Sequence, residues 1–484
     1  MTMWGGARAL AVVLLLAAVP AGGCAGDRAS EPPDPVAGVH LQASAWQPCG
    51  QHGAECATLP VPLDWAAPDG ERITLALTRQ RARKPEQRIG PLFFNPGGPG
   101  GAPVLGVRDF PHVVFSDDLR DRFDLIGLDP RGVGESRPAI TCPVPPVSQQ
   151  VTQFPSTAAE FEALSAYNRK VGTECRKATG PLLEHVDSIS AARDIEAVRR
   201  VLGEEQLSWL GLSYGTLLGA TYAQLYPDRI RAAVLDGPVD HATPAGQFFL
   251  DETRSAEDSF AGFAEWCRAD TTCPLQGRDI RADYRELLDR AARQPVPAKD
   301  DPDGVTAEQI GMGTYAMLTM RTGWAGLAEA IAAAISPTPD AAALGALTAA
   351  GSDKAAYRAI MCHDFPSDIR DFADFGTRLA TARGEAPITR GYVEGADVQA
   401  GCLGWPIVAA NPTGPVEVRG AAPIMIVAGT HDPATPQQWG AAMVRQIQDS
   451  FLVTWDGFGH TAYLNDPATV RREIAYLIDP TTRP

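Results

Sequence analysis

The sequence has little positive charge. It contains 42 Lys and Arg residues, five of them Lys, against 58 Asp and Glu residues, and its formal net charge is −16. No cluster of basic residues stands out along the chain. This argues against a nucleic acid as the partner.

The sequence also lacks the motifs of several cofactor-dependent classes. It has neither G-x-G-x-x-G nor G-K-[ST], so the sequence gives only weak support for nucleotide binding by its glycine-rich loop at 96–101. Its cysteines do not have metal-ligand spacing, and no internal repeat is visible. The composition is that of an ordinary globular protein, with 45% hydrophobic and 21% charged residues. We expect no metal and no cofactor, and a length of 484 residues allows one or two domains.

An apolar run near the N-terminus indicates export. It extends from Ala9 to Ala18 after Arg8, is too short to span a bilayer, and fits the central part of a signal peptide. Small residues at 21–23 lead to Cys24, as in a bacterial lipobox. We therefore expect cleavage of residues 1–23, lipidation of Cys24, and a Pro-rich tether at 24–40 at the outer face of the cytoplasmic membrane. The alternative is cleavage without lipidation, which would give a secreted protein.

Eight of the nine cysteines remain when Cys24 is set aside. An even number in an oxidising compartment predicts disulfides, although eight cysteines allow 105 pairings. Pairing of nearest neighbours is the simplest hypothesis: Cys49–Cys56, Cys142–Cys175, Cys267–Cys273 and Cys362–Cys402.

Short apolar runs alternate with helical patterns over the first half of the chain and again near its end. Strands are expected at 57–65, 73–81, 91–95, 123–128, 207–212, 229–236, 422–428 and 451–455, and helices at 191–202, 216–225, 327–335, 341–350 and 468–478. The second strand alternates as in an antiparallel edge hairpin. The pattern predicts an α/β fold with a mostly parallel, doubly wound sheet.

The alternation stops between about 241 and 420, where the chain is rich in alanine and helical in pattern. We expect this stretch to be a helical cap domain inserted after the sixth strand, over the strand ends. The sheet domain would then consist of residues 41–240 and 421–484.

Several local features of the sheet domain carry further expectations. Asp129 and Arg131 can form a structural ion pair near a strand end, and Ser190 can cap a helix. Thr435 is expected as a helix N-cap followed by Pro436 at the first helical position. Residues 142–183 contain four prolines in their first half and are expected to be irregular.

The stretch 207–222 reads L-S-W-L-G-L-S-Y-G-T-L-L-G-A-T-Y. It places G-x-S-x-G between a buried strand and a helix, which is the context of a nucleophile elbow. The turn is so tight that side chains at Gly211 and Gly215 would collide. Ser213 would be left in a strained backbone conformation with its hydroxyl above the sheet.

An acid and a histidine follow two later strands, in the chain order Ser213, Asp432, His460. This is the order of α/β-hydrolase triads. His460 would take the serine proton, and Asp432 would hold the imidazole tautomer. Asp456 and Asp236 compete with Asp432 for the acid position, and Asp432 is favoured by its place after a strand. We expect His431 to be at most a supporting residue.

The glycine-rich loop Pro96–Gly101 follows the third expected strand. In α/β-hydrolases such a loop supplies one backbone donor to the oxyanion hole. We expect the two donors to be the N–H groups of Tyr214 and Gly98.

Six motifs together resemble the secreted tripeptidyl aminopeptidases of actinobacteria, relatives of the proline iminopeptidases. They are N-P-G-G-P-G-G at 95–101, D-P-R-G-V-G-E-S at 129–136, G-L-S-Y-G-T at 211–216, L-D-G-P-V-D at 235–240, G-T-H-D-P-A-T-P at 429–436 and G-H-T-A-Y at 459–463. The resemblance implies an α/β-hydrolase fold and a serine exopeptidase that removes short peptides or single residues from free N-termini. It also implies a cap that narrows the cleft.

An exopeptidase must bind an ammonium group, which a carboxylate on the cap would do. Asp364 is the first candidate because a disulfide at Cys362 would fix its position, and Glu394 and Asp397 are held in reserve. Two other functions stay open. One is a carboxylesterase or lipase of the same fold, because the triad does not distinguish ester from peptide substrates. The other is a non-catalytic binding protein of the cell envelope, which an intact triad argues against.

Overall fold

The computed structural model describes residues 34–299, 301–347 and 354–483. The expected signal peptide, Cys24 and most of the expected tether lie outside these ranges, as do the last residues of the helix expected at 341–350. Within the described ranges, none of the helices combines the length and the apolar character needed to cross a membrane.

A mostly parallel sheet of nine strands organises the molecule, in the order β1-β2-β3-β5-β4-β6-β7-β10-β11. Its strands are β1 Gln47–Cys49, β2 Ala54–Pro62, β3 Arg72–Gln80, β4 Gly90–Asn95, β5 Phe123–Leu128, β6 Leu207–Leu212, β7 Ile230–Asp236, β10 Ile424–His431 and β11 Phe451–Phe458. The pairs β1–β2, β2–β3 and β3–β5 are antiparallel. The remaining pairs are parallel. This confirms the predicted α/β fold, with the first hairpin at one edge.

Burial explains why the central strands read as continuous apolar runs. All residues of β4 and β6 are buried, as expected of parallel strands covered on both faces. The helices that accompany the sheet are α1 Pro103–Asp109, α2 Pro111–Val114, α3 Asp117–Arg122, α5 Ser188–Leu202, α6 Tyr214–Leu225, α15 Gln437–Gln446, α16 Ala462–Asn465 and α17 Pro467–Ile478. Short 3₁₀ helices lie at Pro85–Gln87, Pro181–Glu184, Pro227–Arg229 and Arg321–Gly323.

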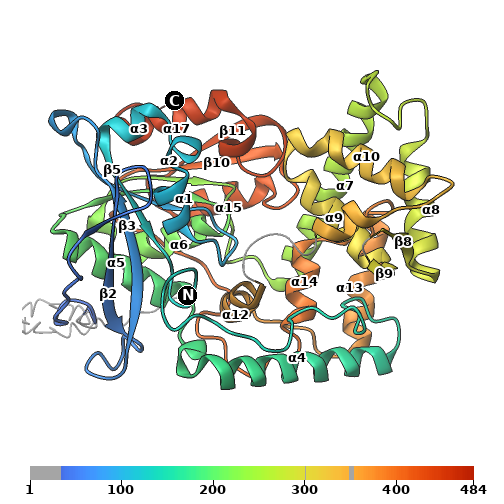
Figure 1. The fold of residues 1–484 in the computed structure, drawn as a ribbon, viewed down its shortest axis with the longest axis horizontal. Helices are drawn as coiled ribbons and strands as arrows, with labels where there is room; N and C mark the ends of the chain where they lie inside the picture. Colours follow the sequence, from blue (N-terminus) through green and yellow to red (C-terminus); the bar gives the residue numbers. More distant parts are fainter. Residues whose placement is uncertain (1–33, 300, 348–353, 484) are drawn as a thin grey trace, which may run out of the picture.

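The stretch between β7 and β10 forms a helical region beside the sheet (Figure 1). It comprises α7 Ala245–Ala269, α8 Ile280–Arg293, α9 Ala307–Leu318, α10 Trp324–Ala334, α11 Ala342–Leu347, α12 Lys354–Asp364, α13 Phe372–Glu385 and α14 Glu394–Gly401, with the small hairpin β8 Val296–Ala298 and β9 Asp301–Val305. Most of these helices share an apolar cluster of their own, separate from the clusters that flank the sheet. We call residues 241–420 the helical insertion.

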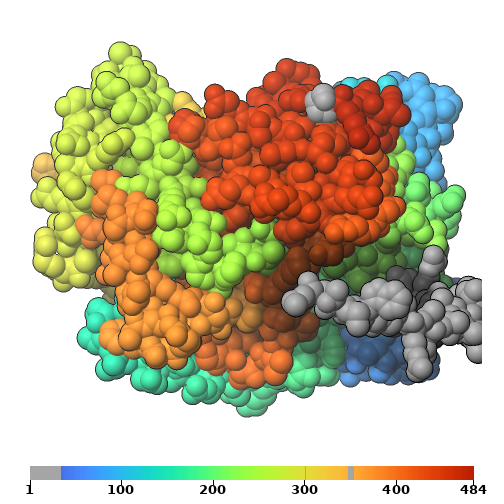
Figure 2. Space-filling model, turned by 180° about the vertical axis from the view of Figure 1, so that it is seen from behind, coloured from blue at the N-terminus to red at the C-terminus, as the bar shows by residue number. Residues whose placement is uncertain are grey.

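A long helix was missed in the stretch expected to be irregular. Helix α4 spans Ala158–Thr179 and begins with a capping box in which Thr157 and Glu160 satisfy each other's backbone N–H groups. Four prolines of this stretch precede the helix and Pro181 follows it, so none of them interrupts it. The Asn168 side chain donates hydrogen bonds to the carbonyls of Ala400 and Leu403, which joins α4 to the helical insertion. Figure 1 shows α4 along the lower edge, below α12, α13 and α14, and Figure 2 shows the same edge from behind.

One local expectation in the sheet region, an ion pair between Asp129 and Arg131, is corrected by the structure. Arg131 does not pair with Asp129. It forms two hydrogen bonds of 2.7 Å with the buried carboxylate of Asp194, while Asp129 accepts from the N–H groups of Val104 and Glu135. Both carboxylates therefore brace loops of the scaffold.

Two helix starts also differ from the prediction. The N-cap of α5 is Asp187, whose side chain accepts from the backbone N–H of Ser190, and the N-cap of α15 is Pro436. The hydroxyl of Thr435 does not cap α15. It donates a hydrogen bond to the buried carboxylate of Asp432 instead.

The described residues form four disulfides: Cys49–Cys56, Cys142–Cys175, Cys267–Cys273 and Cys362–Cys402. They join the same neighbours that the simplest pairing suggests. The first closes the edge of the sheet, the second links a loop to α4, and the last two lie in the helical insertion.

Candidate active site

The turn between β6 and α6 holds Ser213 in a strained conformation. Its φ is 56° and its ψ is −126°, a region that non-glycine residues rarely adopt. Ser213 lies directly before the first residue of α6, so the positive end of the helix faces the same space as its side chain. This is the geometry of a nucleophile elbow.

Steric contacts explain the two glycines of the motif. A Cβ atom at Gly211 would lie 2.3 Å from the carbonyl oxygen of Gly215, and one at Gly215 would lie 2.5 Å from the carbonyl oxygen of Asn95. Both contacts involve backbone atoms that cannot move aside cheaply. The turn therefore requires glycine at both positions, as the sequence predicted.

Asp432 and His460 meet at the carboxyl ends of β10 and β11. The His460 Nδ1 lies 3.0 Å and 2.9 Å from the two carboxylate oxygens of Asp432, whose side chain is fully buried. The carboxylate also accepts from the backbone N–H groups of Ala434, Thr435 and Thr461. These bonds fix the acid in one orientation, which in turn fixes the imidazole ring.

The other ring nitrogen of His460, Nε2, is buried and has no hydrogen-bond partner among the described residues. Two contacts place it near the elbow. The backbone N–H of Ser213 donates to the carbonyl of Asp236, and a Cβ on the next residue, Gly237, would lie 3.0 Å from Cε1 of His460. The nitrogen is thus available to a hydroxyl from the neighbouring turn.

The electrostatics of the pair suit a base held by an acid. Burial favours the neutral form of His460, but the carboxylates of Asp432, Glu394 and Asp236 outweigh it and raise the pKa of His460. Burial alone would raise the pKa of Asp432, but His460 and the surrounding donors lower it. Asp432 therefore stays ionised next to the ring.

The competing residues have other partners. Asp236 accepts from the N–H groups of Ala462 and Tyr463, and within the described part of the chain its carboxylate forms no hydrogen bond with the imidazole of His460. Asp456 is exposed and bonds to the hydroxyl of Thr430. His431 bonds to Asp258 and stacks on a phenylalanine, away from Asp432.

Thr435 is a residue that sequence reasoning assigned to a different role. Its hydroxyl donates to Asp432 at 2.8 Å and lies 3.2 Å from Nδ1 of His460. The signal was present in the sequence, since Thr435 lies three residues after Asp432, the spacing at which a side chain can turn back onto a carboxylate.

The glycine-rich loop approaches the elbow closely. A Cβ at Gly97, whose φ is 85°, would lie 2.9 Å from Cβ of Ser213 and 3.0 Å from the backbone nitrogen of Tyr214. Only a glycine fits this approach. The next residue, Gly98, lines the large cavity of the molecule.

Asp364 is not where the sequence analysis placed it. It ends α12 and is fully buried, and its Oδ1 accepts from the backbone N–H and the hydroxyl of Ser188 and from the amide of Asn411. Its Oδ2 accepts from the hydroxyl of Tyr214. Because both oxygens are occupied beneath the elbow and Asp364 is not among the residues that line the cavity, its predicted role in binding a substrate amine is corrected.

A cavity of about 1290 Å³ extends from Gly98, beside the elbow, into the helical insertion, and Ser213, Asp432 and His460 are not among the residues that line it. Gly98 and Thr319 lie at the end near the catalytic candidates, because the carbonyl of Thr319 accepts from the backbone N–H of His460 at 2.6 Å. Both reserve acids, Glu394 and Asp397, line the cavity. Asp397 is paired with the guanidinium of Arg358 at 2.8 and 2.9 Å.

Glu394 has no such basic partner among the described residues. Its Oε1 accepts from the hydroxyl of Tyr357 at 2.6 Å, and burial raises its pKa. Behind it, the buried Glu252 accepts from the N–H of Gly395, and burial together with Glu394 raises the pKa of Glu252 well above its usual range. Sequence reasoning missed Glu252, although the acidic pair Asp251-Glu252 directly after the apolar run F-F-L in α7 was a visible signal.

Across the described residues, no three His, Cys, Asp or Glu side chains converge as ligands for a metal ion. The serine, histidine and aspartate of this site have the side chains of nucleophilic and acid–base chemistry.

Comparisons with known proteins agree with this geometry. The family model described as "alpha/beta hydrolase fold" matches residues 90–307, and the one described as "TAP-like protein" matches residues 392–484. The Serine protease Hip1 of Mycobacterium tuberculosis is 32% identical over 511 residues, which cover 100% of this chain and 96% of that protein.

Two further relatives have different names. The Carboxylesterase B of Mycobacterium tuberculosis is 31% identical over 93% of this chain and 90% of its own length. The Tripeptidyl aminopeptidase of Streptomyces coelicolor is 30% identical over 83% of this chain and 76% of its own length.

Proposed function

This chain belongs to the α/β-hydrolase peptidase family and is a serine hydrolase, and we propose that it is an exported serine exopeptidase acting on free N-termini. One observation carries the catalytic part of the proposal. His460 is bonded to Asp432 through Nδ1, and its buried Nε2 is left without a partner among the described residues, next to a strained serine.

The proposed mechanism is an acyl-enzyme cycle. The Ser213 Oγ attacks the scissile carbonyl carbon while Nε2 of His460 takes the hydroxyl proton. The imidazolium, stabilised by Asp432, then gives this proton to the leaving amine as the C–N bond breaks. A water molecule repeats the sequence on the acyl-enzyme, which releases the peptide acid and restores the serine hydroxyl.

The oxyanion of the tetrahedral intermediate would be bound by the backbone N–H groups of Tyr214 and Gly98. Tyr214 is the first residue of α6, so its N–H has no partner within the helix. Gly98 lines the cavity beside the elbow. Such preorganised donors contribute most where the charge develops, in the transition state.

The exopeptidase part of the proposal rests on Glu394, which takes the place of Asp364. Glu394 lines the cavity and forms no ion pair within the described chain, and its carboxylate raises the pKa of His460. A carboxylate in this position suits a substrate ammonium group. Glu252, held behind it, adds a second carboxyl group. Residues 241–420 would act as the cap that closes this chamber over the strand ends.

The proposal is tested with chromogenic peptide amides that have free or acetylated N-termini, measured beside a p-nitrophenyl ester. We expect cleavage of the free-amine peptides only, lost in Ser213→Ala. Cleavage of acetylated peptides at the same rate would contradict an exopeptidase.

A carboxylesterase is the second candidate, favoured by the relative of that name. Ester turnover without cleavage of any peptide amide would establish it. If a fluorophosphonate did not label Ser213, the hypothesis of a non-catalytic binding protein of the cell envelope would be favoured instead.

Export is proposed from the first 24 residues. Residues 1–23 would be removed, and Cys24 would carry the lipid that holds the enzyme at the membrane. Labelling of the wild type by a fatty-acid probe in cells, lost in Cys24→Ala, is the expected result. An unlabelled wild type found in the medium would indicate simple secretion.

A further inference from the structure

The large cavity extends well beyond Glu394, and α9 lies along it. Residues on one face of this helix line the cavity at helical spacing over its whole length: Glu308, Met312, Tyr315, Ala316 and Thr319. The far end of the helix contacts the catalytic loop, because the carbonyl of Thr319 accepts from the N–H of His460. The helix therefore runs from the triad toward the distal wall, where Glu308 lies.

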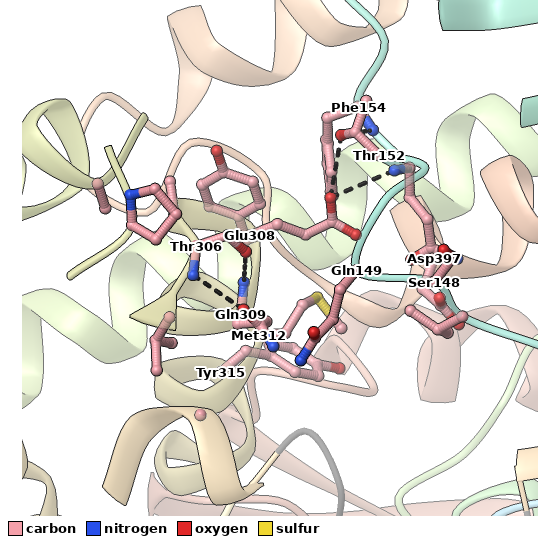
Figure 3. A pocket seen from close by; sticks show the side chains of 18 of the residues that line it. Ser148, Gln149, Thr152, Phe154, Thr306, Glu308, Gln309, Met312, Tyr315 and Asp397 are labelled. Carbon is pink, nitrogen blue, oxygen red and sulfur yellow. Dashed lines mark hydrogen bonds between the residues drawn. The ribbon is translucent and has the colours of Figure 1, made fainter. Parts of the chain in front are cut away.

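The carboxylate of Glu308 is held in place by one oxygen only. Its Oε2 accepts from the hydroxyl of Thr152 at 3.0 Å and from the backbone N–H of Gln153 at 3.2 Å. Its Oε1 has no hydrogen bond among the described residues, and Figure 3 shows the carboxylate among the side chains that line the cavity. The amide oxygen of the neighbouring Gln309 already accepts a hydrogen bond from the N–H of Thr306.

Glu308 also differs from Asp397, another acid that lines the cavity. Asp397 is neutralised by Arg358, whereas Glu308 takes part in no ion pair within the described ranges. Burial, with a contribution from Asp397, raises the pKa of Glu308 to about 7. A half-buried carboxylate without a cation is costly, and a cationic ligand would reduce that cost.

We propose that Glu308 is a second ammonium-binding position, which holds the N-terminus of substrates whose acyl part is several residues long. The inference rests on the proposed exopeptidase function. Glu394, which acts on His460, would serve substrates with a short acyl part, and Glu308 would serve longer ones.

The length of α9 sets the expected size of the longer product. Eleven residues separate Glu308 from Thr319, which corresponds to about 16 Å along a helix axis. An extended peptide rises about 3.4 Å per residue. Roughly three to five residues thus fit between Glu308 and the carbonyl at Ser213, once the reach of the side chains is allowed for.

The first experiment measures binding without catalysis. Ser213→Ala is titrated calorimetrically with a tetrapeptide amide, with its N-acetyl form and with a single amino-acid amide. Adding Glu308→Gln keeps an oxygen acceptor for Thr152 and Gln153 but removes the charge. We expect it to weaken binding of the free tetrapeptide about 10- to 100-fold and to leave the other two ligands unchanged.

Glu286→Gln is the matched control, because it removes the same charge from an exposed position on α8. Equal losses for free and acetylated tetrapeptides, or equal losses in the control, would overturn the proposal. Binding of an N-acetyl peptide with lysine at its first position, if it depended on Glu308, would also overturn the proposal. Glu308 would then recognise a side chain and not the N-terminal ammonium group. An unchanged midpoint of thermal unfolding for the Glu308→Gln variant shows that this substitution leaves the fold in place.

The second experiment measures kcat/KM on p-nitroanilides with one to five residues. Glu308→Gln should reduce kcat/KM only for the longer substrates, and unchanged values at every length would overturn the proposal. The two hypotheses fail separately. Peptide binding that depends on Glu308, without any peptide cleavage, would refute the exopeptidase and keep the site, whereas cleavage that is indifferent to Glu308 would refute the site alone.

Discussion

The sheet and the helical insertion build their parts of the site by different means. In the sheet region, backbone geometry places the reactive groups: a strained serine, two glycines that admit no Cβ, and a carboxylate held by three N–H groups. In the helical insertion, half-buried acids such as Glu394 and Glu308 line a large cavity. The comparison teaches that turns of the sheet hold the reactive groups, whereas the acids that we propose for substrate choice are held by packing between helices.

The largest expected effect lies in the sheet region. Asp432→Asn removes the charge that holds the imidazole, and kcat should fall about 10⁴-fold, as in other triads. Asp236→Asn is the matched change, because Asp236 is also a buried acid at a strand end but bonds only to backbone N–H groups. We expect less than a tenfold loss there, measured with a p-nitrophenyl ester. A larger loss for Asp236→Asn would make Asp236 the catalytic acid.

A glycine in each region gives the second comparison. Gly215→Ala would drive a Cβ against the Asn95 carbonyl. It should destabilise the protein by about 1 to 3 kcal/mol and displace Ser213, lowering kcat/KM more than 100-fold by our rough expectation. Gly376→Ala lies in α13 with no atom within 4 Å of the new Cβ. It should stabilise the protein by about 0.5 to 1 kcal/mol without changing activity. Urea unfolding measures both, and equal stabilities would contradict the steric argument.

These two regions also differ in what their sequence reveals. The elbow was predicted because its glycines are required by contacts within a few residues, and the strand runs are readable because both faces are buried. Asp364 was misplaced because its position beside Cys362 does not say which face of α12 carries it. Glu252 and Glu308 could not be ranked as candidate binding residues from the sequence, since their exposure to solvent depends on segments far away in the chain. Helix α4 was missed because the prolines before it were taken to describe the whole stretch.

Glu394→Gln should have an intermediate effect on kcat/KM, and this effect should differ between peptide substrates with a free amine and ester substrates. Losing a charge-assisted bond to an ammonium group lowers kcat/KM on free-amine substrates with one residue by about 10- to 100-fold. Ester hydrolysis should continue, because an ester without an amine does not use Glu394. A parallel loss on both substrates would indicate that Glu394 only supports the fold.

The same variant has an expected pH effect. The carboxylate of Glu394 is one of the groups that raise the pKa of His460. Because His460 must be neutral to accept the serine proton, activity falls as the pH drops through this pKa. Removing the charge lowers the pKa of His460, so the acidic limb of the ester profile should move to lower pH. A limb that stays in place would mean that Glu394 does not act on His460.

The smallest effect is expected at Thr435, which links the two halves of the acid–base pair. Its hydroxyl donates to Asp432 and lies beside Nδ1 of His460, so Thr435→Val leaves a buried charge with one donor fewer. Three backbone N–H groups still hold the carboxylate, and kcat should therefore fall only about tenfold, with KM unchanged. Thr435→Ser keeps the hydroxyl and should restore kcat. If Ser and Val lose activity equally, the methyl group of Thr435 rather than its hydrogen bond positions the acid, and packing would then matter in the sheet region as it does in the helices.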